Sequence, residues 1–214
     1  MGSLPPEEGR GTKMQNIFFL SLLLLISCFS LYGENGNYFV AIDIPQEIED
    51  TVDSCKEILA KQLFGTFEPR EKYHITLKYL GELNQEQLLS AQTILENKLK
   101  NQQEFSIWVK ELGFFPGIKK ARVAWVGAHS IELYKLQSMI ENSLSQFSRT
   151  EKFQAHITIA RLSYPPPVWL LEKFQKKIEE KALSTQFTAK EILLFKSIQG
   201  KYEKIASFPL SKQE

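Results

Sequence analysis

Apolar and polar positions form short blocks from residue 38 onward, and their spacing changes between the period of a strand and that of a helix. The predicted strands are Tyr38–Ile44, Tyr73–Leu80, Phe105–Leu112, Arg122–Gly127, Ala155–Leu162, Phe187–Ile198 and Tyr202–Phe208. The predicted helices are Gln46–Leu63, Asn84–Lys100, Ser130–Phe147 and Val168–Leu183. Asn84 and Gln87 form a capping-box pattern at the start of the second helix. We expect the last two strands to form a hairpin around Gln199 and Gly200.

The order of these elements is partly repeated along the chain. Each half contains two helices and one strand with the sequence His-Ile-Thr, which indicates a weak internal duplication of about 85 residues. The two copies are His74–Thr76 and His156–Thr158. We therefore expect two related α+β lobes packed about a shared cleft.

The first 37 residues do not follow this pattern. A polar extension, Met1–Lys13, precedes the apolar run Ile17–Tyr32, whose 16 residues suit a signal-peptide core and are short for a bilayer span of about 20. Leu25–Cys28 also resembles a bacterial lipoprotein cleavage box, and a mis-assigned start before a cytosolic protein is the alternative. We predict an exported or membrane-anchored protein, with residues 1–37 as extension, signal-like or anchor segment and linker, and residues 38–214 as the folded domain.

Bulk composition restricts the class of protein without indicating a function. Apolar residues make up 43% of the chain and charged residues 24%, which is ordinary for a globular domain. The formal net charge of +1 excludes a strongly basic nucleic-acid-binding protein, so that any contact with RNA must be local. The two cysteines, Cys28 and Cys55, form neither a CxxC pair nor a zinc-ligand spacing.

The repeated His-Ile-Thr sequence contains the candidate catalytic and phosphate-binding residues. Side chains alternate along a strand, so His74 and Thr76 share one face, and His156 and Thr158 share one face of the other strand. A lone histidine on a strand is more often structural, but two that converge in one cleft can act as general acid and general base. Threonine hydroxyls can donate hydrogen bonds to phosphate oxygens. A metal site is a poorer interpretation because no Asp, Glu or Cys stands at ligand spacing, and there is no nucleophile-elbow motif.

Several longer stretches strengthen this interpretation. The chain resembles the two-histidine phosphoesterase superfamily, and in particular its RNA 2',3'-cyclic phosphodiesterase branch, also called bacterial 2'-5' RNA ligase-like proteins. The resemblance rests on "YFVAIDIP", "HITLKYLGEL", "LGFFPGIKKARVAWVG", "AHITIARL" and "YEKIASFPL", which span nearly all of Tyr38–Leu210. One departure is Ala155, where the branch usually has proline.

The resemblance implies an α+β fold of two pseudo-symmetric lobes, with antiparallel strands lining a central cleft and helices packed outside. It implies hydrolysis of a 2',3'-cyclic phosphate at an RNA or oligonucleotide end to a 2'-phosphate without a metal. We also expect a monomer that needs no other cofactor. His156 would activate water, His74 would protonate the departing 3'-oxygen, and Thr76 and Thr158 would bind the phosphate. The alternatives are another cyclic nucleotide or an ADP-ribose cyclic phosphate as substrate, or a non-catalytic nucleotide- or RNA-binding module.

Two further positions follow from the resemblance, and a third follows from strand alternation. Arg161, five residues after His156, matches an arginine of the family site, and Tyr79 holds the equivalent place after His74, where an aromatic side chain can stack on a base. Strict alternation puts Arg161 on the face opposite His156 unless the strand bulges, and a salt-bridged arginine and a core tyrosine are the alternatives. Lys78 shares the face of His74 under strict alternation, so it is either a phosphate contact or an exposed lysine.

The remaining expectations concern partners and location. RNA or a nucleotide with a 2',3'-cyclic phosphate is the expected partner, together with membrane contact through residues 17–32. A cytoplasmic location, the norm in this family, is the alternative to export. His129 and the basic turn Gly117–Arg122 are interpreted as surface features, with an RNA-backbone contact as the alternative for the turn.

Overall fold

The structure is a computed structural model that describes residues 36–148 and 152–212, together with Met1. The chain divides into two units, Met1–Asn35 and Gly36–Glu214, and the fold below is that of the second. The predicted signal-like segment at residues 17–32 and Cys28 lie outside the described residues. Within the described ranges, no helix has both the length and the apolar character that crossing a membrane requires.

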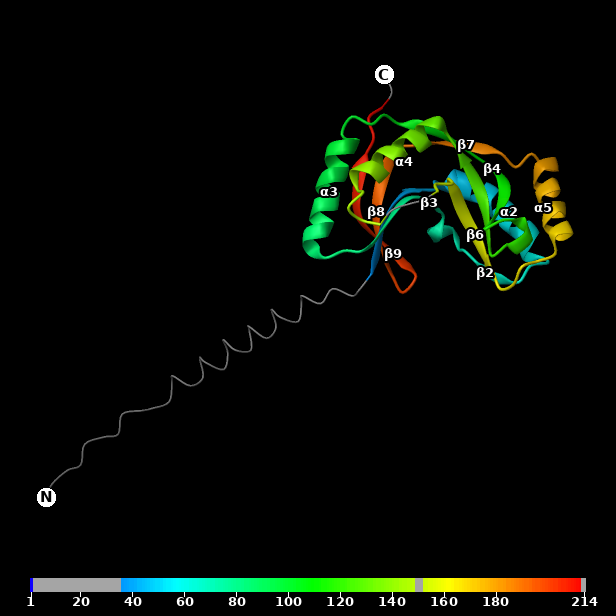
Figure 1. Cartoon of the computed structure of the whole chain (residues 1–214), viewed down its shortest axis with the longest axis horizontal. Coiled ribbons are helices and arrows are strands. Elements are labelled where there is room, and N and C mark those ends of the chain that lie inside the picture. The colour runs from blue at the N-terminus through cyan, green and yellow to red at the C-terminus, as the bar shows by residue number, and fades with distance from the viewer. Residues whose placement is uncertain (2–35, 149–151, 213–214) are drawn as a thin grey trace. The chain divides into compact units, whose positions relative to one another are not determined.

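Strands and helices alternate much as the apolar pattern predicts. The strands are β1 (Asn37–Asp43), β2 (Gly65–Phe67), β3 (His74–Glu82), β4 (Phe105–Phe115), β5 (Val123–His129), β6 (His156–Leu162), β7 (Thr185–Ala189), β8 (Glu191–Ile198) and β9 (Lys201–Pro209). The helices are α2 (Gln46–Ala60), α3 (Gln85–Leu99), α4 (Ile131–Ser143) and α5 (Val168–Glu180), with 3-10 turns η1 (Arg70–Lys72) and η2 (Ile118–Lys120). The predicted α+β class is therefore confirmed (Figure 1).

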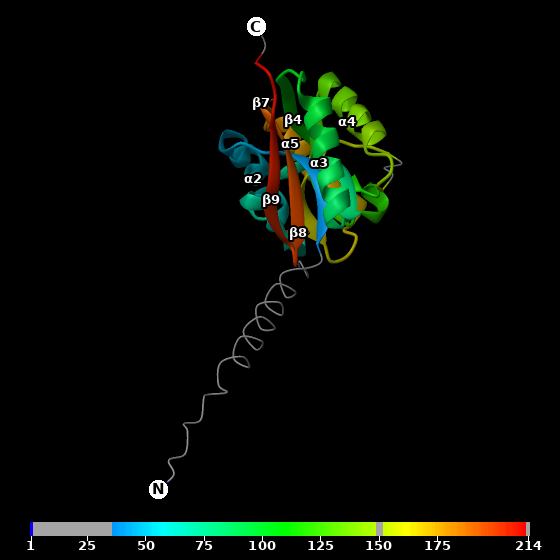
Figure 2. The same ribbon diagram turned by 90° about the vertical axis from the view of Figure 1, so that its left-hand side faces the viewer.

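All strand pairs between these elements are antiparallel, in the order β7-β4-β5-β6-β3-β1-β8-β9, with β2 beside β6. At the middle of this order, β3 and β6 are paired through a single position, Ile75 opposite Ile157. This seam joins two lobes. The first lobe contains β3, β1, β8 and β9, covered by α3 and α4, and the second contains β6, β5, β4 and β7, covered by α2 and α5. Figure 2 shows α3 and α4 on the same side of β8 and β9.

The lobes are not consecutive halves of the chain. The C-terminal hairpin β8–β9 joins the first lobe because β8 pairs with β1. Likewise α4, which follows β5 of the second lobe, packs on β3 of the first. The first lobe thus combines strands from both ends of the folded domain, whereas β4 to β7 of the second lobe are consecutive, and the internal duplication describes paired motifs rather than separable domains.

Local signals set the starts of two helices where they were expected, whereas α2, α4 and α5 end three or four residues before their predicted last residues, Leu63, Phe147 and Leu183. The Asn84 side chain accepts from the Gln87 amide at 2.8 Å, and the Gln87 side chain accepts from the Asn84 amide at 2.9 Å, which completes the predicted capping box. Ser130 caps α4 through the Leu133 amide at 3.4 Å.

Two strand predictions were wrong. The predicted single strand Phe187–Ile198 is two strands separated at Lys190, because β7 pairs with β4 while β8 pairs with β1 and β9 in the other lobe. The short strand β2 was missed, since its three residues show no alternation of buried and exposed positions. The predicted hairpin turn is confirmed, with positive φ angles of 50° at Gln199 and 78° at Gly200.

Candidate active site

Both histidine strands contain the same irregularity, three residues after the histidine. Where β3 pairs with β1, Thr76 faces Ala41 and Lys78 faces Val40, so Leu77 has no residue opposite. Where β6 pairs with β5, Thr158 faces Trp125 and Ala160 faces Ala124, so Ile159 has none. Each extra residue is a β-bulge, which shifts the later alternation by one position. The burial of the first seven residues is consequently identical in the two strands.

The bulges decide which side chains accompany the histidines. Tyr79 and Arg161, which strict alternation puts on the opposite face, lie on the histidine face, where Tyr79 is 47% exposed and the Arg161 side chain 63% exposed. The condition that Arg161 needs to reach a bound phosphate, a bulge before it, is therefore present.

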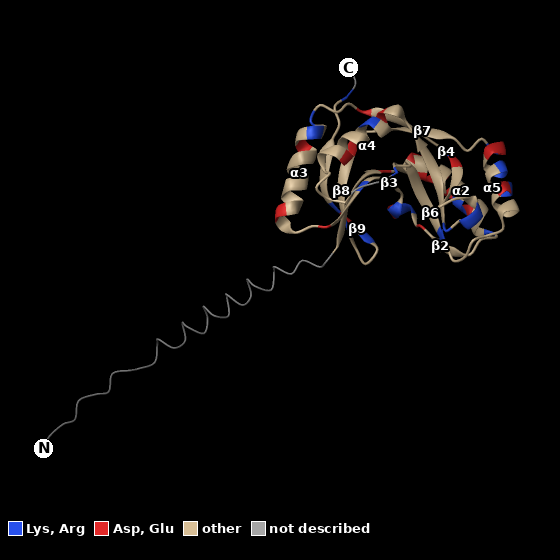
Figure 3. Ribbon diagram, viewed as in Figure 1, with Lys and Arg blue, Asp and Glu red and all other residues tan. Residues whose placement is uncertain are grey.

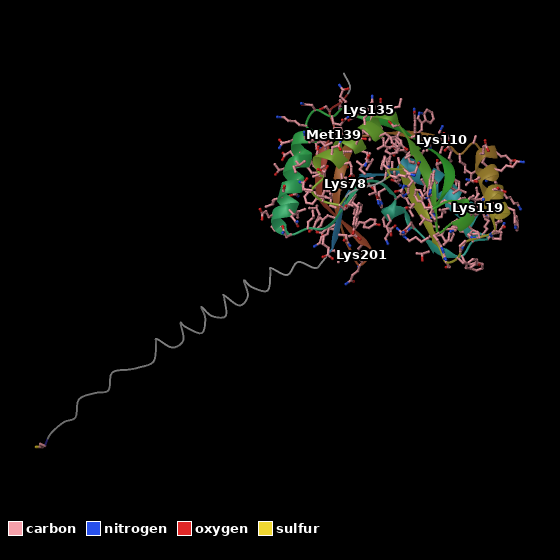
Figure 4. The ribbon with its side chains drawn as sticks, in the orientation of Figure 1. Lys78, Lys110, Lys119, Lys135, Met139 and Lys201 are labelled. Carbon is pink, nitrogen blue, oxygen red and sulfur yellow. The ribbon has the colours of Figure 1, made fainter. Side chains whose placement is uncertain are left out.

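The same bulge removes Lys78 from the site. Lys78 is 1% exposed, and its Nζ donates to the Ser148 carbonyl at 2.5 Å and forms an ion pair with Glu141 of α4 at 2.9 Å. Figure 4 shows Lys78 beneath α4. Neither interpretation of Lys78, a phosphate contact or an exposed lysine, was correct, because both assumed unbroken alternation.

The seam brings the two tripeptides together. Because β3 and β6 run antiparallel with Ile75 opposite Ile157, His74 lies beside Thr158 and Thr76 lies beside His156. The two histidines are thus diagonal neighbours, which in a regular ladder are roughly 7–8 Å apart. The isoleucines between them are fully buried and hold the seam in the core. This arrangement leaves two imidazoles and two hydroxyls around one position on the concave face.

Each imidazole is oriented by a backbone carbonyl two residues earlier. Nδ1 of His74 is 2.7 Å from the Lys72 oxygen, and Nδ1 of His156 is 2.6 Å from the Gln154 oxygen. A carbonyl can only accept, so Nδ1 donates in both rings and Nε2 is the nitrogen that exchanges protons. In the first lobe, Nε2 of His74 also lies 3.0 Å from the Thr76 hydroxyl.

Aromatic rings form a wall around each histidine. The His74 ring is 5.1 Å from Phe39 and meets Tyr202 edge-on at 5.3 Å. The His156 ring meets Phe115 edge-on at 4.9 Å and lies 6.0 Å from Trp125. Burial by these walls is the main cause that lowers the pKa of His74 and that of His156, and the hydrogen bonds to the carbonyls partly oppose it.

Charged neighbours distinguish the two histidines. The carboxylates of Asp43 and Glu68 act to raise the pKa of His74, whereas the Arg161 guanidinium acts to lower the pKa of His156. Arg161 Nε lies 3.2 Å from Glu68 Oε1, so the salt-bridged arginine that was the alternative interpretation is present, and the phosphate contact of Arg161 stays a prediction. The two histidine strands therefore have similar backbones, but nearby side chains give the two imidazoles different electrostatic surroundings.

Sequence reasoning did not single out Glu68 or the four aromatic wall residues. Phe39, Phe115, Trp125 and Tyr202 all stand within the stretches that carry the family resemblance, which was a usable signal. Glu68 follows the unpredicted strand β2, where its amide donates to the Ile159 carbonyl at 3.0 Å, and no local pattern indicates this.

Other candidate groups lie elsewhere. Cys55 is buried on α2, and burial raises the pKa of its thiol to about 12. His129 ends β5, with Nε2 3.5 Å from the Glu111 carboxylate. Among residues 36–148 and 152–212, no group of three or more His, Cys, Asp or Glu side chains is placed to hold a metal ion.

A His-x-Thr strand from each of two lobes, joined at one seam, defines a two-histidine phosphoesterase fold. A family model of the 2'-5' RNA ligase superfamily matches residues 44–201, and the chain belongs to this superfamily. A Thermotoga maritima protein named RNA 2',3'-cyclic phosphodiesterase is 36% identical over 135 residues, which cover 61% of this chain and 72% of that protein. A protein of the same name from Methanocaldococcus jannaschii is 32% identical over 161 residues, which cover 74% of this chain and 90% of that protein.

Solved structures show the same fold. A Thermus thermophilus protein matches with a TM-score of 0.69 at 17% identity, over 83% of this chain and 100% of its own. Escherichia coli LigT complexed with 3'-AMP matches with a TM-score of 0.63 at 21% identity, over 83% of this chain and 99% of its own. These structures support the arrangement of two lobes about a central cleft.

Proposed function

We propose that the protein hydrolyses a 2',3'-cyclic phosphate at an RNA or oligonucleotide end to a 2'-phosphate, with His74 and His156 as acid–base pair and without a metal or other cofactor. The observation that carries the proposal is the pair of imidazoles at the seam, each with Nδ1 bound to a carbonyl and Nε2 left to move a proton. The names of the Thermotoga maritima and Methanocaldococcus jannaschii relatives support this substrate.

The surroundings of the two histidines favour His156 as base and His74 as acid. Asp43 and Glu68 favour the protonated form of His74, and Arg161 favours the neutral form of His156. In the proposed step, Nε2 of His156 takes a proton from water as the water oxygen bonds to phosphorus. The bond from phosphorus to the 3'-oxygen breaks, and Nε2 of His74 gives its proton to that oxygen.

The remaining site residues would hold the substrate. The Thr76 and Thr158 hydroxyls stand beside the histidines and suit the non-bridging phosphate oxygens. The Arg161 guanidinium adds a positive charge on the same face, and Tyr79 offers an exposed ring for a base. Because the bound phosphate is an anion, it would counteract the burial that lowers the pKa of both histidines.

The test is hydrolysis of a 2',3'-cyclic nucleotide and of a short RNA with the same end, in the presence of EDTA. We expect turnover to a 2'-phosphate by residues 38–214, which we propose as the catalytic domain. His74→Ala and His156→Ala should each reduce kcat by 10²-fold or more with unchanged circular dichroism. His129→Ala, a matched control outside the seam, should retain activity. Full activity of either seam variant excludes the two-histidine mechanism.

Two alternatives have their own signatures. Hydrolysis of an ADP-ribose cyclic phosphate in preference to the RNA end would change the substrate and keep the mechanism. Binding of a 2'-phosphate product with no turnover of any cyclic phosphate would indicate a non-catalytic module.

The apolar run Ile17–Tyr32 supports a separate proposal, that the protein is exported or membrane-anchored. The mass of the mature protein from its natural host tests this. A chain that starts before residue 17 and is found only in the cytoplasm would contradict it.

A further inference from the structure

Two exposed aromatic side chains lie beyond the Arg161 end of the seam. Phe64 is 67% exposed and Tyr164 is 52% exposed, and their rings are 6.1 Å apart at an interplanar angle of 32°. Exposed aromatic rings offer π-faces on which the bases of single-stranded nucleic acids stack. We call Phe64, Tyr164 and the neighbouring Arg122 the aromatic–basic platform.

Backbone hydrogen bonds fix the platform to the active-site strand. The Ser163 amide donates to the Phe64 carbonyl at 3.0 Å, and Arg122 Nη1 donates to the Ser163 carbonyl at 2.7 Å. Gly65 makes this close approach feasible, because a Cβ atom there would lie 2.2 Å from the Arg161 carbonyl oxygen. The platform is therefore attached to the chain directly after β6, the strand that contains His156 and Arg161.

The charges on this side suit a polyanion. Arg122 follows Lys119 and Lys120 of η2, and none of these three forms an ion pair with a carboxylate of the described residues. Lys and Arg positions lie near the ends of β2 and β6 (Figure 3), and Figure 4 shows Lys119 in the second lobe. A local basic group is the kind of RNA contact that a net charge of +1 still allows.

The length of β6 shows what kind of ligand would reach the platform. Leu162, the last residue of β6, is six residues beyond His156, and Tyr164 follows it. At ~3.3 Å per residue Leu162 is roughly 20 Å from His156, slightly less because of the bulge, and the platform lies past that end of the strand. A stacked strand rises about 3.4 Å per nucleotide, so a mononucleotide held between the histidines cannot also cover the platform.

We propose that the aromatic–basic platform binds the RNA nucleotides that precede the terminal cyclic phosphate. The inference rests on the proposed function and extends it, because it assigns a binding site for the RNA chain as distinct from its reacting end. Bases stack on Phe64 and Tyr164, and Arg122 contacts a backbone phosphate. This contact is insensitive to sequence, since every base has a π-face.

The test compares two substrates with the same terminal nucleotide, a 2',3'-cyclic mononucleotide and a six-nucleotide RNA with a 2',3'-cyclic phosphate. In the full chain, Phe64→Ala/Tyr164→Ala should lower kcat/KM for the RNA by about 10-fold or more, and leave that for the mononucleotide within about 2-fold. Arg122→Ala should reduce the slope of log kcat/KM against log salt by about 1 for the RNA only.

The mononucleotide rate also reports folding of each variant. Trp108→Ala is the matched control, since Trp108 of β4 is 48% exposed and lines a hollow of about 1030 Å³ with Tyr134 and Lys135 of α4, a hollow that none of the platform residues lines. Equal losses on both substrates, no loss on the RNA, or a larger loss in Trp108→Ala would overturn the platform.

Failure of the proposed function is recognised separately, because the wild type would then hydrolyse neither substrate. In that case, the affinity of the protein for a six-nucleotide RNA with a 2'-phosphate end, measured by fluorescence anisotropy, tests the platform. The double variant should bind this RNA about 10-fold more weakly, and unchanged affinity refutes the proposal.

Discussion

Replacing Lys78 by methionine tests whether this lysine stabilises the fold or contacts the substrate phosphate. Methionine retains most of the side-chain volume, so the variant removes the charge without opening a large cavity. What remains is the Glu141 carboxylate without the ammonium group 2.9 Å away, and the Ser148 carbonyl without its donor at 2.5 Å. The expected consequence is lost stability with retained chemistry.

The magnitude follows from burial. Removing one partner of a buried ion pair costs about 3–5 kcal/mol. The Lys78 side chain is 0% exposed but that of Glu141 is 18% exposed, so water can partly solvate the remaining carboxylate and the lower value, ~3 kcal/mol, applies. For a domain of this size each kcal/mol lowers Tm by about 2–4 °C, which gives a decrease of ~6–12 °C.

Thermal unfolding followed by circular dichroism measures this decrease. Lys110→Met is the control, because the Lys110 side chain is 46% exposed and 3.9 Å from Glu111, and such a pair contributes about 0–1 kcal/mol. Adding Glu141→Gln to Lys78→Met should recover part of the loss. At a temperature where both proteins are folded, kcat on a cyclic phosphate should stay within about 3-fold, since Nζ points to α4. An unchanged Tm with kcat reduced by 10-fold or more would refute the structural role.

Three further predictions concern the surroundings of the two histidines. Because burial lowers both histidine pKa values below about 6.5, the bell-shaped profile of kcat/KM should have its maximum on the acid side of that value. Glu68→Gln removes a carboxylate that raises the pKa of His74, so the alkaline limb of the pH–rate profile should move to lower pH, and an unmoved limb counts against His74 as acid. In Gly113→Ala the new Cβ would lie 2.1 Å from the Trp125 ring, so this wall must shift and kcat should fall by about 10-fold. Gly117→Ala, with no atom within 4 Å of its Cβ, should behave as wild type in the same assay.

Local periodicity made much of the site predictable. The strands around His74 and His156 follow from apolar alternation, and their isoleucines lie in the core as that alternation requires. Alternation also puts Thr76 and Thr158 on the faces of their histidines, where the structure has them. These conclusions depend only on the two or three residues that precede each bulge. Over those residues the strand is regular, so its side chains alternate as predicted.

Longer-range features could not be derived in this way. A bulge depends on how two strands pair, so the sequence after either threonine does not show that an extra residue is inserted there. The error at Lys78 follows directly from this. The division at Lys190 has the same cause, because β7 and β8 are separate strands only by virtue of their partners in different lobes. Glu68 reaches the site through β2, whose three residues are too few for any period to be visible.

The matching bulges also show how a repeated motif could serve the two different roles that the proposed mechanism requires. The backbone repeat brings the fifth residue after each histidine to the cleft, so a single substitution at that position changes the electrostatic surroundings directly. The first strand has Tyr79 there, an uncharged ring, and the second has Arg161, whose charge acts against protonation of His156. Glu68 pairs with this arginine and acts in favour of protonation of His74. In the proposed mechanism, the charges of Arg161 and Glu68 at one end of the seam would therefore make His156 the base and His74 the acid, on two strands whose backbones are nearly alike.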